Sequence, residues 1–203
     1  MNIEISNLDR INIEDSVKAK GYLWFENGDY NLNIVGVRDL TKGQKATNLF
    51  DDQITVSYKV NGEWNFHSFK ATTEPSPLYL KSPLNAKGTA ILKPMQHRGA
   101  YAIGMHAGQY EALRQVGKLV IYRDNDRDGN YDYINESDSF NDGINIHRAS
   151  SHSESIYIDK WSAGCQVIAD VKDWNIFISL VKKSASLWGN KFTYTLITTD
   201  DLI

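Results

Sequence analysis

Hydrophobic and polar positions alternate along several short stretches of the chain, as they do in strands that are half buried in a sheet. In the clearest stretch, residues 54–60 alternate with period two and return, after an Asn-Gly turn, as residues 64–69. Further apolar runs predict strands at 22–25, 32–37, 89–92, 100–103, 119–122, 144–147, 165–168 and 192–197. The pattern therefore predicts a mainly β chain.

One stretch has the spacing of an amphipathic helix. Apolar residues recur every three or four positions over 171–181, Asp170 is a suitable N-cap, and Gly189 marks the end. A short helical turn is predicted at 110–115, and the polar residues 1–20 are predicted to be an extended lead-in. We expect a mixed β-sandwich or barrel with one long C-terminal helix and one short helix.

Prolines interrupt the strand pattern at Pro75, Pro77 and Pro83 and mark a loop. They divide the chain into an N-terminal β-rich portion, residues 1–80, and a C-terminal portion, residues 81–203. A chain of 203 residues with 41% hydrophobic content can bury a core as one domain. We therefore predict that the N-terminal portion belongs to the same domain as the rest.

The composition limits the possible partners and location. The formal net charge of −3 provides no basic field, so nucleic acid is not an expected partner. The N-terminal segment lacks a basic and apolar signal peptide, and no apolar run is long enough to span a membrane. The sequence thus predicts synthesis in the cytoplasm without a signal peptide. It leaves the oligomeric state open.

The single cysteine, Cys165, is the main candidate for chemistry. It ends the small-residue segment Ser162-Ala163-Gly164, and His147 lies upstream on a separate predicted strand. A thiol near an imidazole can become the nucleophile of an acyl-transfer reaction, and glycine lets main-chain amides approach the oxyanion. A lone cysteine is more often a small buried hydrophobe. The residues that flank Cys165 favour its interpretation as a nucleophile over that as a buried hydrophobe.

The segment from Ile144 to Ile168 resembles the catalytic domain of the L,D-transpeptidase (YkuD-type) family. That family's signature is a histidine, a spacer and then Ser/Thr-His-Gly-Cys, and the segment from Lys93 to Ile103 is similar to its Pro-x-Gly-x-Tyr-x-Ile strand. The resemblance covers roughly Gly88 to Ile168. It implies a YkuD-like fold for residues 81–203.

Carried over by position, the resemblance implies that Cys165 is the nucleophile and His147 the base. It places the amides of Gly164 and Cys165 in the oxyanion hole and matches Ser162 to the residue that opens the signature. Enzymes of this family attack the carbonyl between the third and fourth residues of a peptidoglycan stem peptide, and pass the acyl group to an amine or to water. No cofactor is implied.

The chain departs from the signature at several positions. Ala163 replaces the second histidine, Gln166-Val167 replace an apolar residue followed by Arg or Asn, and Arg148 follows the base where a small residue is common. These changes leave transpeptidation and hydrolysis, as in an L,D-carboxypeptidase, equally open. The predicted substrate contacts are His106, Arg148, Trp161 and Tyr101; His106 is also a rival for the base.

An acidic loop carries a second candidate site. Asp124, Asp126 and Asp128, followed by Gly129, match the start of a calcium loop, and Asp132 adds a carboxylate. The twelfth position lacks the usual Glu, and an acidic hairpin turn explains the same residues without a metal. The hairpin is favoured and calcium stays a weaker alternative.

Two other functions remain open. One is a cysteine amidase or peptidase with an intracellular substrate, and the other is a non-catalytic structural or binding module with a buried thiol. Because a stem peptide lies outside the cytoplasm, the wall-enzyme interpretation needs a delivery route. A phage-encoded lytic protein or a secreted effector would supply one, and a phage or prophage origin is the favoured hypothesis.

Overall fold

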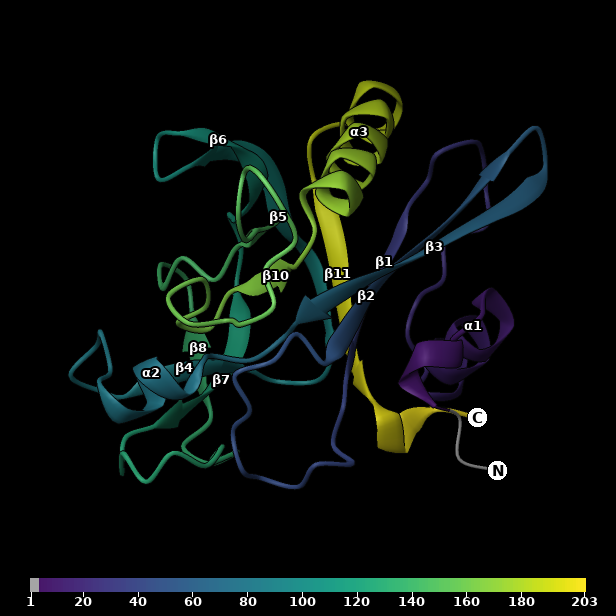
Figure 1. Ribbon diagram of the computed structural model, residues 1–203. Helices are drawn as coiled ribbons and strands as arrows, with labels where there is room; N and C mark the ends of the chain where they lie inside the picture. Colours follow the sequence, from purple (N-terminus) through teal and green to yellow (C-terminus); the bar gives the residue numbers. More distant parts are fainter. Residues whose placement is uncertain (1–3) are drawn as a thin grey trace.

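The structure, a computed structural model, describes residues 4–203 and is mainly β (Figure 1). In this range, eight strands close into a barrel in the order β1-β11-β5-β6-β9-β10-β3-β2, and β4-β7-β8 form a second sheet. The barrel strands are β1 (Asn33–Arg38), β2 (Asp52–Val60), β3 (Glu63–Thr72), β5 (Gln96–His106), β6 (Tyr110–Gln115), β9 (Ile146–Arg148), β10 (Gln166–Ile168) and β11 (Phe192–Thr198). The second sheet comprises β4 (Thr89–Leu92), β7 (Leu119–Asp124) and β8 (Ser137–Ser139). The prediction of a mainly β fold is confirmed, and β2–β3 is the predicted hairpin.

The described helices are α1 (Arg10–Ala19), α2 (Pro77–Lys81) and α3 (Val171–Trp188). Helix α3 is the predicted long C-terminal helix. Its N-cap, Asp170, accepts a hydrogen bond from the main-chain N–H of Lys172 at 2.8 Å. The apolar side of α3, including Trp174 and Phe177, packs into the barrel core. No helix within residues 4–203 is long and apolar enough to cross a membrane.

Helix α1 replaces part of the extended lead-in predicted for residues 1–20. Asp9 caps the helix, and Ile13 and Val17, one turn apart, are fully buried. They pack in a cluster with side chains of β1 and β11. The prediction was wrong because this tertiary packing, rather than a strong local pattern, stabilises the helix. Residues 1–3 of the predicted lead-in lie outside the described residues.

Two other predicted elements also differ from the structure. Residues 110–115, predicted as a helical turn, form β6 because a tight turn at Ala107 and Gly108, both with positive φ, pairs them with β5. Residues 22–25 form no strand. The main-chain N–H and C=O of Phe25 are hydrogen-bonded to the side chain of Asn33 rather than to a neighbouring strand. In each case long-range pairing overrides the local pattern.

The N-terminal strands share the barrel with the strands that follow residue 80. β1 runs parallel to β11, and a Cβ at Gly36 would lie 1.9 Å from the hydroxyl of Tyr194. The absence of a side chain at Gly36 lets that hydroxyl donate to Oε1 of Gln166 at 3.0 Å. Since Gln166 is the first residue of β10, this contact helps to position the segment that carries Cys165.

Candidate functional site

Parallel pairing of β9 with β10 places the strand that carries His147 beside the segment that carries Cys165. His147 pairs with Val167, and the main-chain N–H of Gln166 donates to the carbonyl of Asn145 at 2.9 Å. Cys165 therefore lies beside Asn145, and because side chains alternate along a strand, Asn145 and His147 face the same side. Cys165 and His147 are therefore diagonal neighbours across the parallel pair.

The sulfur of Cys165 is held by main-chain groups. Its Sγ accepts a hydrogen bond from the N–H of Asn145 at 3.4 Å and lies 3.5 Å from the carbonyl oxygen of Gly143. Within residues 4–203, no hydrogen bond joins Sγ to an imidazole. Burial raises the pKa of the Cys165 thiol to about 11, against a smaller lowering by the Asn145 N–H. The resting thiol is therefore protonated at neutral pH.

His147 is held in one tautomer. Its Nδ1 lies 2.7 Å from the carbonyl oxygen of Arg148, and a carbonyl can only accept, so Nδ1 carries the proton. The hydroxyl of Tyr110 donates to the same carbonyl at 3.2 Å. Burial first, then the neighbouring His106 and Arg148, lower the pKa of His147 to about 3. The ring is thus neutral at pH 7 and its Nε2 is the free lone pair that a general base needs.

His106, the rival base, stacks on His147 with ring centroids 4.1 Å apart and an interplanar angle of 23°. Its Nδ1 lies 3.2 Å from the side-chain nitrogen of Asn145, whose Oδ1 accepts from the N–H of Gln115. Nδ1 of a neutral His106 therefore accepts a hydrogen bond, and its proton is on Nε2. This arrangement leaves His147 as the imidazole with a free Nε2.

The turn before Cys165 depends on glycine. Gly164 has φ of 127°, and a Cβ there would lie 2.5 Å from the carbonyl oxygen of Ala90. Its N–H, predicted to face an oxyanion, instead donates to the hydroxyl of Ser162 at 3.2 Å inside the turn. The N–H of Cys165 has no hydrogen-bond partner among the described residues. It is the amide left to stabilise an oxyanion.

Ser162 has a structural position. The residue is fully buried, and its hydroxyl lies 2.9 Å from the carbonyl oxygen of Glu74 and 2.8 Å from that of Cys165. It thus ties the turn to the segment that follows β3. The serine shapes the main chain around the sulfur and does not reach a reacting atom.

The four predicted substrate contacts, His106 among them, lie outside the cavity at Cys165. Tyr101 is fully buried in the core, where its ring meets Tyr194 edge-on. The guanidinium of Arg148 stacks over the ring of Tyr110 at 4.0 Å. Trp161, partly buried, packs with Cys165 against a buried cluster. Because Tyr101 is fully buried and does not line the cavity, its role as a substrate contact stays a prediction.

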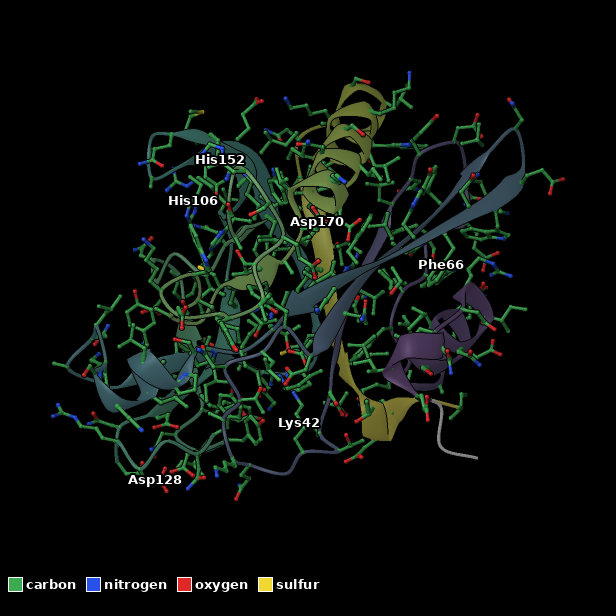
Figure 2. All side chains as sticks on the ribbon, in the orientation of Figure 1. Lys42, Phe66, His106, Asp128, His152 and Asp170 are labelled. Carbon is green, nitrogen blue, oxygen red and sulfur yellow. The ribbon has the colours of Figure 1, made fainter. Side chains whose placement is uncertain are left out.

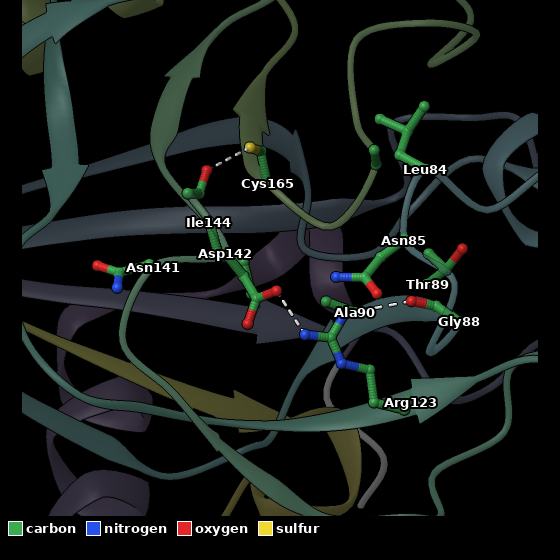
Figure 3. A pocket seen from close by; sticks show the side chains of 12 residues that line it. Leu84, Asn85, Gly88, Thr89, Ala90, Arg123, Asn141, Asp142, Ile144 and Cys165 are labelled. Carbon is green, nitrogen blue, oxygen red and sulfur yellow. Dashed lines mark hydrogen bonds and ion pairs between the residues drawn. The ribbon is translucent and has the colours of Figure 1, made fainter.

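The cavity at Cys165 has a volume of about 390 Å³, and most of the residues that line it were not singled out by the sequence (Figure 3). Its charged groups are Arg123, from β7, and Asp142, which form an ion pair. Arg123 also donates to the carbonyl of Gly88 at 3.2 Å. The remaining wall includes Leu84, Asn85, Thr89, Ala90, Asn141, Ile144 and Ala163. One sequence signal for these residues is that Asp142 stands two residues before Ile144, where the segment that resembles the family signature begins.

No model of a protein family, no curated protein and no solved structure matches this chain. The functional argument therefore depends on the geometry of the site.

In the acidic loop, Asp128 lies in the lower part of the view in Figure 2, whereas His106 lies in its upper part. Asp124 is almost fully buried, and its Oδ2 accepts from the N–H of Asp132 at 3.1 Å. Burial, together with the nearby carboxylates, raises the pKa of Asp124 to about 6. Asp126 accepts from the main-chain N–H of Asp128. Among residues 4–203, no three acidic, His or Cys side chains are grouped to hold a metal ion. Calcium binding stays a prediction.

Proposed function

We propose that this protein is a cysteine acyl-transfer enzyme that acts on peptidoglycan stem peptides, as an L,D-transpeptidase or an L,D-carboxypeptidase. One observation carries the proposal. The carbonyl of Arg148 fixes the proton of His147 on Nδ1, so that a free Nε2 lies on the strand beside the only thiol of the chain. That thiol also opens into a cavity.

The reaction begins from a neutral pair. Because the pKa of Cys165 is raised to about 11 and that of His147 is lowered to about 3, both groups are uncharged at pH 7. Nε2 of His147 accepts the thiol proton as Sγ attacks the amide carbonyl, so proton transfer accompanies the attack. The free N–H of Cys165 donates to the oxyanion that forms.

The leaving amine takes its proton from the imidazolium of His147, and the C–N bond breaks to leave a thioester on Cys165. The carbonyl of Arg148 stabilises the imidazolium through Nδ1, and Tyr110 donates to the same oxygen. Water or an acceptor amine, deprotonated by Nε2, then attacks the thioester and releases the thiol. Transfer to water makes the enzyme a carboxypeptidase, and transfer to an amine makes it a transpeptidase.

The shape of the site supports a peptide substrate. The cavity of about 390 Å³ lies in the range of small-molecule sites and can hold the few residues on either side of a scissile bond. Its wall combines an ion pair with the amides of Asn85 and Asn141, which suit the polar groups of a peptide. The substrate lies in the cell wall, so the proposal includes delivery there, as for a phage lytic protein or an effector.

The test uses purified protein and a muropeptide with a tetrapeptide stem. We expect loss of the terminal D-residue by mass spectrometry and an acyl adduct on Cys165 in the intact protein. Cys165→Ala should abolish both, and His147→Gln should lower the rate by about 10²–10⁴-fold, the range for a general base. His67→Gln, a histidine on β3 that contacts neither residue, is the matched control.

A non-catalytic module with a buried thiol is the second candidate. It is favoured by the absence, among the described residues, of a hydrogen bond between Sγ and either imidazole, and by the raised pKa of Cys165. The adduct separates the candidates. If the wild-type protein forms no adduct with tetrapeptide stems or with other activated acyl donors, the enzyme proposal is wrong.

A further inference from the structure

The cleft at Cys165 contains one cationic side chain whose role the proposed reaction does not explain. Arg123 lines the same cavity as the sulfur, and Figure 3 shows the two at separate places on its wall. A second cavity, of about 510 Å³, shares Arg123, Asp142 and Asn85 with the first. The ion pair of Arg123 with Asp142 therefore stands where the two cavities meet.

The guanidinium of Arg123 is held in place and keeps free donors. Asp142 binds one terminal nitrogen and the carbonyl of Gly88 binds the other, which uses two of the five N–H groups. Nε has no hydrogen-bond partner within residues 4–203 and is not among the buried polar atoms without a partner, so its N–H is accessible. A planar guanidinium with a free edge matches the two oxygens of a carboxylate.

The charged side chains around Arg123 define its surroundings. The pKa of Asp142 is lowered by Ser139, Arg123 and Lys87, against the opposing effect of burial, so this carboxylate is ionised and neutralises Arg123. Lys87 and Asp138 line the second cavity and carry opposite charges, and Asp138 is paired with Lys118. The formal charges of the two linings therefore balance, and Arg123 is the cationic side chain that shares a cavity with the thiol.

The path from sulfur to guanidinium is short. Sγ of Cys165 lies 3.5 Å from the carbonyl of Gly143, and the preceding residue, Asp142, holds Arg123. Two residues of main chain thus separate the two groups. A peptide covers roughly 3.3–3.6 Å per residue, so the residue that follows a scissile amide, with its terminal carboxylate, has a comparable reach.

We infer that Arg123 binds the free terminal carboxylate of the peptide whose last amide bond Cys165 attacks. The inference rests on the proposed function and deepens it. It makes the enzyme specific for substrates with one residue beyond the scissile bond, because a longer chain would meet the ion pair of Arg123 with Asp142 at the junction of the cavities. Arg123 is then the residue that distinguishes a chain end from an internal amide.

Binding tests the inference without turnover. The Cys165→Ala protein is titrated by calorimetry with a stem tetrapeptide and with the same peptide carrying a C-terminal amide. We expect the acid to bind at least tenfold more tightly. Adding Arg123→Gln should make the two affinities equal, Arg123→Lys should retain part of the preference, and Arg98→Gln, an exposed arginine outside the cavity, should change nothing. Thermal denaturation shows whether each variant is folded.

The outcomes separate this inference from the proposed function. Equal affinities for acid and amide, a preference that survives Arg123→Gln, or no binding of either peptide at millimolar concentration overturns the role of Arg123. The proposed function still stands in these cases if the wild-type protein forms the Cys165 adduct. Conversely, a carboxylate preference that depends on Arg123, without any adduct or cleavage, supports the binding role of Arg123 and contradicts the proposed reaction.

Discussion

The neutral state of the thiol and imidazole can be tested through the pH dependence of alkylation. Cys165 is the only cysteine, so uptake of iodoacetamide reports on this sulfur alone. Burial raises its pKa from 9.0 to about 11. This difference lowers the thiolate fraction at neutral pH by about 100-fold relative to an unperturbed thiol. Since only the thiolate reacts with iodoacetamide, labelling slows accordingly. The structure therefore predicts slow labelling of the native protein at pH 7.

Part of this effect is offset by nucleophilicity. A thiolate of higher pKa is the stronger nucleophile, with a Brønsted coefficient of about 0.4–0.5, which over two pKa units returns a factor of about 6–10. The net expectation is labelling roughly tenfold slower than that of the same cysteine in the unfolded chain. Between pH 6 and 10 the rate should rise about tenfold per pH unit, with an inflection near pH 11.

The assay follows intact mass against time, with the urea-unfolded protein as the reference and Cys165→Ala as the blank. A rate that is already high and constant between pH 6 and 8 would show a preformed thiolate–imidazolium pair and refute the neutral-pair reasoning. A rate equal to that of global unfolding would show that the sulfur is inaccessible in the native state. That second result would favour the non-catalytic module.

Three other substitutions examine the surroundings of the thiol and imidazole. Arg148→Gln is expected to raise the pKa of His147, because a nearby positive charge disfavours the imidazolium; an NMR titration of the ring measures it, and an unchanged or lower value contradicts the assignment. Tyr110→Phe removes one donor to the Arg148 carbonyl and should lower kcat about two- to tenfold at constant KM, since a neutral hydrogen bond contributes about 0.5–1.5 kcal/mol. Gly164→Ala should destabilise the fold by about 1–3 kcal/mol in urea denaturation, because its Cβ would lie 2.5 Å from the Ala90 carbonyl; an unchanged midpoint would show that the turn can relax.

Local signals were sufficient for the elements that the sequence predicted well. The alternation and Asn-Gly turn of 54–69 specify a hairpin, and the stripe from 171 to 181 behind a capping Asp170 specifies helix α3. Helix α1 and strand β6 were missed because packing against β1 and pairing with β5 decide them. These contacts join distant parts of the chain, and no window of sequence contains them.

The same division holds within the site. Cys165 and His147 stand in a short motif, and parallel pairing of β9 with β10 places their segments side by side. Arg123 and Asp142 were missed because no pattern joins them. Arg123 reaches the cleft from β7 of the second sheet, and Asp142 stands in the loop before β9. Their approach depends on how the second sheet meets the barrel, which is a tertiary property.

The departure of the motif at Ala163 has a spatial counterpart. The signature that the sequence resembles has a histidine at this position, and here a second imidazole comes from His106, at the end of β5, which stacks on His147 at 4.1 Å. Two stacked rings at this distance cannot both be protonated without strong repulsion, and His106 is among the causes that lower the pKa of His147. Asn145 completes the arrangement, because its side chain bonds His106 while its main-chain N–H bonds Sγ. Burial is the main cause of the resting neutrality of both groups, and for the imidazole it is reinforced by His106, which lies far from Cys165 in sequence and adjacent to His147 in space.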